Sequence, residues 1–395
     1  MKIAIFQKRT HFHKNSGGLE IQSKELAEGL CKSGYEVHII SPKHELSENS
    51  REENSVSYHF IESEYRMGKF FGFGGESDKN NWFYKSNKYF EEIHNTEKFN
   101  LIISQNSAGL TVMKNRKKYG IKALCITHGS ISSEFKTALL EYEFPNQLVK
   151  FIKDSAFVLK NFFGRQREMV HNADLVVSVS TFVKKALVEE TFVSEEKIIV
   201  IPNGVNSPNV QIKSDFSAPL KLISVGRLEK SKGFHILLDA VSKLDLDFKL
   251  TIIGDGPYEA KLKEKAERLN LSGKVIFLGK IQRAEIYEQL SNAHIFIFPT
   301  LRYEGFPMVL VESLIMGIPV IGSNIGGVSD AIIDNFNGYL TKLNDVADLT
   351  KKIQKLNTDR ELLKTFSANA LQDANSKYTM NKMVQSYIEA IQKLI

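Results

Sequence analysis

The sequence has little of the material on which disulfide-bonded and membrane-spanning proteins depend. Of its 395 residues, two are cysteines, nine are prolines and one is a tryptophan. Two cysteines cannot form a disulfide framework, and they fit a reducing compartment. No hydrophobic run approaches the roughly 18 residues that a membrane-spanning helix needs. Because the opening run Met1–Phe6 is also too short for a signal peptide, the sequence predicts a cytoplasmic protein.

An excess of one charge sign is also nearly absent. The 52 Lys and Arg residues outnumber the 46 Asp and Glu residues by six. This excess suits an anionic ligand but is too small to predict binding to nucleic acid, which we do not expect. With 42% hydrophobic and 25% charged residues, the composition is that of an ordinary globular protein. The length predicts two domains.

Short runs of Val, Ile and Phe alternate with helical patterns along the chain, which is typical of βαβ units with buried parallel sheets. The predicted strands are 2–6, 36–41, 56–61, 101–105, 121–127, 174–179, 197–201, 220–225, 248–253, 274–278, 294–298 and 319–322. Asn203–Asn209 is rich in Pro, Gly, Asn and Ser, and marks a domain boundary. We therefore expect two α/β domains, 1–205 and 218–378, joined by a linker over 206–217.

Ligands of open parallel sheets bind at the carboxyl ends of the strands, so polar residues directly after a strand are the candidates for a site. The segments in question are 7–18, 127–129, 178–181, 226–233, 254–257, 279–283 and 299–307. Because they come from both halves of the chain, one ligand-binding cleft between two domains is the economical arrangement.

Arg227 and Lys232 follow the strand 220–225 in a short loop that contains Gly226 and ends at Gly233. Glycine lets the backbone approach a ligand closely, and an arginine fork beside a lysine point charge suits a diphosphate. A solvated basic loop would explain this pair if it stood alone. The segment described next favours the diphosphate.

A short helix is predicted from about 307 to 316, because Pro307 suits its first turn and Gly317 its end. Its first amide groups favour a phosphate through hydrogen bonds and the helix dipole. Glu304 precedes the helix, and Glu312 lies about five residues into it. Alone, Glu312 would be a surface carboxylate. Its apolar neighbours make an unpaired carboxylate costly, which favours a ligand hydroxyl as its partner.

Taken together, these segments resemble the family-4 retaining glycosyltransferases of the GT-B fold, which move a sugar from a nucleotide diphosphate donor. The matching stretches follow the family's order over nearly the whole chain: Gly17-Gly18, Leu26-Ala27, Gly34-Tyr35-Glu36-Val37, Thr127-His128-Gly129, Ala173-Asp174, Val179-Ser180, Ile201–Val205, Val225–Leu228, Lys232-Gly233, Ile253–Pro257, and Glu304–Pro307 with Glu312. The resemblance implies two Rossmann-like doubly wound domains, one for the acceptor and one for the nucleotide sugar. It also implies that the C-terminal helix, 379–395, returns to the N-terminal domain.

The resemblance implies roles position by position. Arg227 and Lys232 would hold the diphosphate, Glu304 the donor sugar and Glu312 the ribose hydroxyls. With His128 beside the transferred sugar, the expected catalytic residues are His128, Arg227, Lys232 and Glu304. Further donor-binding residues would be Gly17, Gly18, Gly254, Gly305, Phe306, Pro307, Met308 and Val309, with Lys280, Ile281 and Arg283 at the base pocket. One position departs from the family pattern, since Asp330 stands where a Glu is usual.

Fixed cations can meet the charge that builds on the leaving phosphate, so we expect no metal and no cofactor beyond the nucleotide-sugar donor. Asp245-Leu246-Asp247 matches a metal-binding D-x-D motif, but it precedes the strand 248–253 and so lies at the wrong edge of the sheet. His11-Phe12-His13 lacks a third metal ligand, and we interpret it as a solvated pair or an acceptor contact.

The predicted reaction moves a hexose or N-acetylhexosamine, from UDP in preference to GDP, to a hydroxyl of a cell-surface polysaccharide or glycolipid precursor, by displacement on the same face. Two alternatives stay open: a nucleotide-sugar 2-epimerase of the same fold, and a non-catalytic partner subunit that binds nucleotide sugar. The segment 147–171 mixes hydrophobic and cationic residues. It could rest on an anionic membrane carrying a lipid-linked acceptor, at the inner face of the plasma membrane, although packing into the first domain is favoured.

Overall fold

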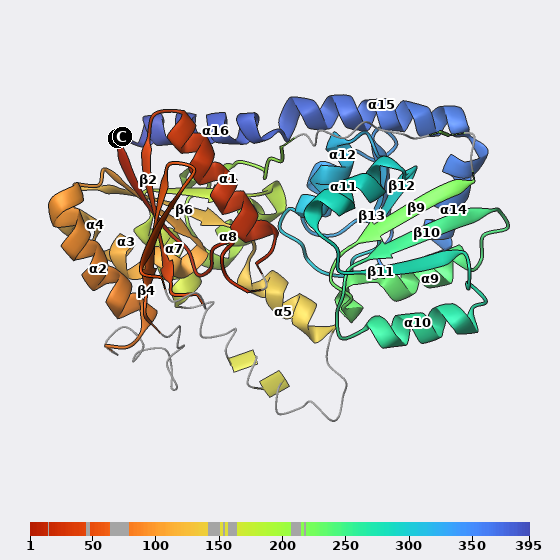
Figure 1. Ribbon diagram of the computed structural model, residues 1–395, viewed down its shortest axis with the longest axis horizontal. Helices are drawn as coiled ribbons and strands as arrows, with labels where there is room; N and C mark the ends of the chain where they lie inside the picture. The colour runs from red at the N-terminus through yellow and green to blue at the C-terminus, as the bar shows by residue number, and fades with distance from the viewer. Residues whose placement is uncertain are drawn as a thin grey trace. The chain divides into compact units, whose positions relative to one another are not determined.

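The computed structural model describes residues 1–14, 16–44, 48–63, 79–140, 151–152, 155–156, 164–206, 215–216 and 219–395. The chain divides into two compact units, each with its own parallel sheet (Figure 1). Unit 1 comprises Met1–Phe135, Leu148–Asn203 and Met380–Ile395, and unit 2 comprises Lys136–Gln147 and Gly204–Thr379. The predicted α/β class with two Rossmann-like domains is therefore confirmed.

Unit 1 is built on an eight-stranded sheet in the order β3-β4-β2-β1-β5-β6-β7-β8. Its strands are β1 (Lys2–Phe6), β2 (Glu36–Pro42), β3 (Ser50–Glu53), β4 (Val56–Ile61), β5 (Leu101–Gln105), β6 (Lys122–Thr127), β7 (Leu175–Ser178) and β8 (Ile198–Val200). All neighbours pair in parallel except β3, which is antiparallel to β4. The strand order reverses between β1 and β5, and such a switch point is where open α/β sheets bind ligands.

Helices cover both faces of this sheet. They are α1 (Gly18–Lys32), α2 (Trp82–Glu97), α3 (Leu110–Lys114), α4 (Arg116–Tyr119), α7 (Arg165–Asn172), α8 (Thr181–Thr191) and α16 (Met380–Leu394), with short 3-10 turns η1 (Asn106–Gly109) and η2 (Glu195–Lys197). A further helix, α5 (Ile131–Leu139), begins in this unit and ends in unit 2. The last helix, α16, packs against α1 in this unit, and Figure 1 shows the two side by side. The two helices can approach this closely because Gly29 has no side chain. A Cβ at this position would lie 2.4 Å from Val384 Cγ2.

Unit 2 is built on a six-stranded parallel sheet in the order β11-β10-β9-β12-β13-β14. Its strands are β9 (Leu220–Val225), β10 (Phe248–Ile253), β11 (Val275–Gly279), β12 (Ile295–Phe298), β13 (Val320–Ser323) and β14 (Gly338–Thr341). Its helical elements are η3 (Lys230–Lys232), α9 (Phe234–Val241), α10 (Glu259–Arg268), α11 (Arg283–Ser291), α12 (Met308–Ile315), α13 (Val328–Ala331), α14 (Val346–Thr358) and α15 (Arg360–Lys377). This strand order is the dinucleotide-binding one, with its switch point between β9 and β12.

The two faces of the second sheet are covered by different helices. Leu222, Leu250 and Ile297 point into a core that α9, α10, α14 and α15 close. Figure 1 shows α9 and α10 on one side of this sheet, and α11 and α12 on the other. The residues discussed below as a site come from the loops at the carboxyl ends of β9, β11 and β12.

The domain boundaries differ in detail from those predicted. The predicted first domain was continuous over 1–205, whereas the boundary between the units falls within α5, after Phe135. The reason is that Leu140, just beyond α5, packs against the core of unit 2. The predicted linker 206–217 lies outside the described residues apart from Asn206, Asp215 and Phe216.

The predicted segment 147–171 can be followed only from Gly164 onward and at four residues before it, so about half of it lies outside the described residues. In the part of the chain that the structure describes, no helix is long and apolar enough to cross a membrane.

Candidate functional site

In unit 2, the loops that follow β9 and β12 meet at the switch point. Lys232 belongs to the first loop and Glu304 to the second, 72 residues away in the sequence. Lys232 Nζ donates a hydrogen bond to Glu304 Oε1 at 2.5 Å. The structure thus brings together two of the predicted catalytic residues at the place where open α/β sheets bind their ligands.

This ion pair is largely withdrawn from solvent. The two side chains are 18% and 14% exposed. Arg302 Nε lies 4.0 Å from the same carboxylate oxygen, so Glu304 has two cations beside it. Two positive charges against one carboxylate leave a local excess that an incoming anion can neutralise.

Glycines hold these loops close together. A Cβ on Gly233, whose φ is +72°, would lie 1.9 Å from the carbonyl oxygen of Pro299 in the loop after β12. A Cβ on Gly254, at φ +136°, would lie 1.9 Å from the carbonyl oxygen of Gly226. The conformation of Gly254 is therefore required by packing between two loops, and its predicted contact with a donor stays a prediction.

Helix α12 begins within a residue of its predicted start. Pro307 is its N-cap residue, and the carbonyl of Pro307 accepts from the amides of Leu310 and Val311. The amides of Met308 and Val309 open the helix, where backbone N–H groups have no intrahelical acceptor. They lie four and five residues after Glu304 in the same loop-to-helix segment, and their predicted contact with the donor stays a prediction.

The Phe306 side chain has a structural role. It is 6% exposed, and its ring centroid lies 5.4 Å from that of Tyr378 in an edge-to-face contact. The phenol of Tyr378 donates to the carbonyl of Asp330, the position that departs from the family pattern. The donor contact that was predicted for Phe306 stays a prediction.

Glu312 is paired within the protein. Arg283 Nη2 and Nε lie 2.6 and 2.9 Å from Glu312 Oε1, and Tyr287 Oη donates to the same oxygen at 3.1 Å. The argument that this carboxylate would be unpaired without a ligand is therefore wrong, whereas its predicted contact with ribose hydroxyls stays a prediction. The reason is that α11 lies beside α12 and carries an arginine and a tyrosine one turn apart.

Two further residues, Lys280 and Ile281, were predicted at the base pocket with Arg283. They follow β11 directly; Lys280 is exposed and Ile281 is half-buried.

Arg227 differs from Lys232 in both exposure and partner. Its side chain is 67% exposed, and Nε donates to Glu229 Oε1 at 2.7 Å. The structure therefore leaves the Arg227 guanidinium at the surface of the loop, beside Glu229, while Lys232 is drawn to Glu304.

In unit 1, the predicted His128 is part of a network of uncharged polar groups at the switch point. His128 Nε2 donates to Gln105 Oε1 at 2.7 Å. Gln105 Nε2 donates to Ser23 Oγ at 3.2 Å, and Ser23 Oγ in turn donates to Gln7 Oε1. Asn106, at φ +50°, accepts the His128 amide through Oδ1 at 3.2 Å. These bonds fix the orientation of the ring.

The state of the His128 ring follows from this network. Desolvation lowers the pKa of His128 to about 4, although the residue keeps some exposure. The ring is therefore neutral near pH 7, with the proton on Nε2 and a lone pair on Nδ1.

Gly17 and Gly18, predicted to approach phosphate, form the start of α1, where the Gly17 amide donates to Glu20 Oε2 at 2.8 Å.

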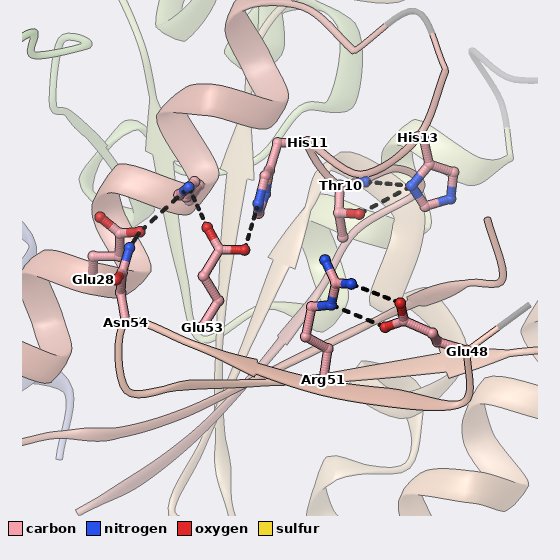
Figure 2. A network of polar contacts seen from close by, with 9 residues as sticks. Thr10, His11, His13, Glu28, Glu48, Arg51, Glu53 and Asn54 are labelled. Atoms are coloured by element: carbon pink, nitrogen blue, oxygen red, sulfur yellow. Dashed lines mark hydrogen bonds and ion pairs between the residues drawn. The ribbon is translucent and has the colours of Figure 1, made fainter. Parts of the chain in front are cut away.

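The two imidazoles of His11-Phe12-His13 are both engaged within unit 1 (Figure 2). His11 Nε2 lies 3.2 Å from Glu53 Oε2, and His13 Nδ1 accepts from the Thr10 amide at 2.9 Å. Phe12 packs against the core of this unit. The expectation of a solvated pair was therefore wrong, because the loop folds back over the sheet beside β3 and β4. Burial lowers the pKa of His11.

A group of side chains with metal-ligand chemistry lies in unit 1, at the opposite edge of the sheet from His128. Its members are Glu36, His38 and Glu97. Lys2 Nζ lies 2.9 Å from Glu36 and 2.5 Å from Glu97. The lysine ammonium therefore neutralises the two carboxylates in the place that a cation would take.

Sequence reasoning missed several of these residues. Gln105 and Asn106 stand at the carboxyl end of a correctly predicted strand, so the rule that selected His128 would also have found them. Tyr287 follows Arg283 by four residues, which places both on one face of a helix. That spacing was the available signal. Nothing in the sequence pattern identified Glu312 as their common partner.

The two sheets and the pairing of Lys232 with Glu304 define a two-domain α/β protein of the GT-B class. Residues 209–373 match the family described as Glycosyl transferases group 1, and residues 16–207 match Glycosyltransferase Family 4. The two matches together span nearly the whole chain. The chain belongs to the family-4, group 1 glycosyltransferases, and the predicted resemblance is confirmed.

Individual proteins give the same result. The chain is 33% identical over 242 residues to an uncharacterized glycosyltransferase of Methanocaldococcus jannaschii, covering 60% of this chain and 66% of that one. It is 26% identical over 250 residues to the putative colanic acid biosynthesis glycosyltransferase WcaL of Escherichia coli, covering 59% and 61%. The crystal structure of Anabaena HepE in complex with UDP superposes with a TM-score of 0.76 at 19% identity, over the full length of both chains. That likeness shows the fold.

Proposed function

We propose that this protein is a retaining glycosyltransferase that moves a hexose or N-acetylhexosamine from a nucleoside diphosphate sugar, UDP in preference to GDP, to a hydroxyl of a polysaccharide or glycolipid precursor. The observation that carries the proposal is the pair of Lys232 and Glu304 at the switch point of unit 2, followed by the open amides of α12. The named role of WcaL in colanic acid biosynthesis supports the acceptor class. UDP bound to HepE supports the nucleotide.

Each residue has a chemical role in this proposal. Departure of the nucleoside diphosphate builds negative charge on the β-phosphate, which Lys232, Arg227 and the amides of Met308 and Val309 would stabilise. Glu304, released from Lys232 as the diphosphate takes its place, would accept hydrogen bonds from the donor sugar. His128 would accept a sugar hydroxyl at Nδ1, because its Nε2 proton is held by Gln105.

The proposed displacement occurs on one face of the sugar. The bond between the anomeric carbon and the β-phosphate oxygen breaks, and a bond from the same carbon to the acceptor oxygen forms. The acceptor proton passes to the leaving phosphate oxygen, so no protein nucleophile is needed. With the negative charge met by fixed cations, we propose that the reaction needs no metal.

A panel of UDP- and GDP-sugars, assayed for nucleotide release with and without candidate acceptors, tests this function. Acceptor-dependent release with a retained anomeric configuration is the expected result. Epimerised nucleotide sugar would indicate a 2-epimerase instead, and binding without turnover of any donor would indicate a non-catalytic partner subunit. Full activity in excess EDTA is expected, and loss of activity that divalent cations restore would contradict the metal-independent mechanism.

A further inference from the structure

The backbone that leads to Glu304 is held by three successive hydrogen bonds, and one acceptor comes from a distant segment. The Arg302 amide donates to Thr300 Oγ1 at 3.1 Å, and the Glu304 amide donates to the Arg302 carbonyl at 2.9 Å. Between them, the Tyr303 amide donates to Thr137 Oγ1 at 3.2 Å, across 166 residues of sequence. The loop after β12 therefore depends on a side chain that the loop itself does not supply.

Thr137 lies near the end of α5, in the part of that helix that belongs to unit 2. The residue is 6% exposed, and its carbonyl accepts from the amide of Leu140, which packs against the core of unit 2. Lys136 Nζ lies 5.4 Å from the centroid of the Tyr303 ring, a cation–π contact with the same loop. The end of α5 is thus a fixed support for the residue that precedes Glu304.

Two glycines hold the Glu304 backbone from its carbonyl group. The Gly327 amide donates to the Glu304 carbonyl at 2.8 Å. Gly326 has φ +58°, and a Cβ there would lie 2.6 Å from the same carbonyl oxygen. The Glu304 backbone is therefore fixed by Thr137 on the residue before it and by the glycines on its own carbonyl.

This support bears on how Glu304 binds a donor sugar. In the free protein, Lys232 Nζ holds the Glu304 carboxylate. In the proposed function that contact is exchanged for hydroxyls of the sugar, so the direction of the carboxylate then rests on its backbone. A displacement of about 1 Å is enough to weaken such a contact.

We propose that Thr137 is a positioning residue, supported by Lys136, that aims the Glu304 carboxylate at the donor sugar and so sets the affinity for the sugar part of the nucleotide sugar. This inference rests on the proposed function, because it takes Glu304 to bind the sugar. It assigns a role to two residues of α5 that the sequence did not single out.

Isothermal titration calorimetry on the full chain tests the proposal with UDP, UDP-glucose, UDP-N-acetylglucosamine, GDP and GDP-mannose. Thr137→Val removes the acceptor oxygen at nearly constant volume, and should weaken the nucleotide sugar about tenfold but the nucleotide less than about twofold. Thr137→Ser keeps the hydroxyl and should stay within about threefold of wild type for both ligands. Thr350→Val is the matched control and should change neither affinity, because Thr350 is 8% exposed and its hydroxyl donates to carbonyls of Ala240 and Val346.

Lys136→Gln gives a second variant at an exposed position, where a substitution should leave the fold intact. It should weaken the nucleotide sugar about two- to fourfold, as expected for an exposed cation–π pair, and leave the nucleotide unchanged. An unfolded fraction lowers the binding stoichiometry and does not change the affinity of the folded molecules. If wild type binds none of these nucleotides or nucleotide sugars, the proposed function fails. If it binds a nucleotide sugar, and Thr137→Val and Lys136→Gln keep that affinity or weaken nucleotide and nucleotide sugar equally, the function stands and the positioning role is overturned.

Discussion

The two units share the order of strands on either side of the switch point, but different kinds of side chain lie there. In unit 2 the loops after β9 and β12 meet through an ion pair, Lys232 with Glu304, and a second cation, Arg302, lies beside it. In unit 1 the hydrogen-bonded network at the switch point, His128 with Gln105, Ser23 and Gln7, consists of groups that are uncharged at neutral pH. The same topology thus presents charge in one unit and oriented neutral groups in the other.

This difference matches the two halves of the proposed reaction. A diphosphate needs positive charge, and a lysine that already balances a carboxylate can exchange that partner for phosphate at limited desolvation cost. A sugar hydroxyl needs a fixed donor or acceptor without net charge, which a neutral imidazole held at Nε2 provides. The comparison teaches that the strand order sets where a ligand binds, while the residues of the loops set which ligand.

Replacing Lys232 should have the largest effect. Lys232→Ala removes the cation nearest Glu304, and we expect kcat to fall by about 10²- to 10³-fold, the usual loss for one fixed group that stabilises developing charge. The measurement is steady-state nucleotide release. Lys230→Ala, on the same 3-10 turn, is the matched control and should keep near wild-type turnover. Near-normal kcat in Lys232→Ala would remove the charged half of the comparison.

The neutral His128 ring of unit 1 predicts a pH dependence of stability. Because the pKa of His128 is about 4 in the folded chain, against about 6.5 when unfolded, the unfolded chain binds more protons between these values. Stability should therefore be constant above pH 6.5 and fall as the pH drops toward 4, by at most about 3 kcal/mol from this residue. His128→Gln should make the fall in unfolding free energy across that window less steep. The fall that remains should come from His59 and His294, whose pKa burial also lowers to about 4. An unchanged slope would mean that the ring is charged in the folded protein.

Gln105 should matter for stability as well as for activity, unlike Lys232. Gln105→Leu keeps the volume but leaves His128 Nε2 without its acceptor and removes one of the two hydrogen bonds of Ser23 Oγ, at a cost of about 1–3 kcal/mol. Activity should fall about tenfold, because the imidazole loses its fixed orientation. Urea unfolding and nucleotide release measure the two effects. Gln105→Glu would show whether a charge is tolerated beside His128. Wild-type stability in Gln105→Leu would contradict the assigned network.

Much of this arrangement could be predicted from the sequence. Hydrophobic runs predicted β1, β4, β5, β9 and β10 with the bounds that the structure shows. They did not predict β3, whose sequence Ser-Arg-Glu-Glu has no apolar residue, or β14, which begins at Gly338. The rule that ligands lie after strands selected Lys232, Glu304 and His128. What identified them was residue type and chain position, which are properties of local sequence.

Partners across the fold could not be predicted in the same way. The Arg283 and Tyr287 contacts of Glu312 depend on how α11 packs beside α12, and no local pattern contains that information. His11 finds Glu53 only because a loop folds over a hairpin 42 residues away. Propensity and motif therefore located the candidate groups, whereas tertiary packing decided which of them are already satisfied.

Replacing Arg227 should have the smallest effect on stability, which would distinguish this cation from Lys232. Arg227 is 67% exposed and paired with Glu229, and such surface ion pairs contribute about 0–1 kcal/mol to stability. Arg227→Ala should therefore leave the free energy of unfolding within about 0.5 kcal/mol of wild type. Donor KM should still rise about tenfold if the guanidinium turns to the diphosphate when the donor binds. Arg227→Lys should give a donor KM between those of wild type and Arg227→Ala, since a lysine offers the phosphates a point charge without bidentate geometry. A donor KM that neither substitution changes would leave Lys232 and the α12 amides to hold the diphosphate without Arg227. The charge of this switch point would then reside in the half-buried pair and in Arg302 beside it.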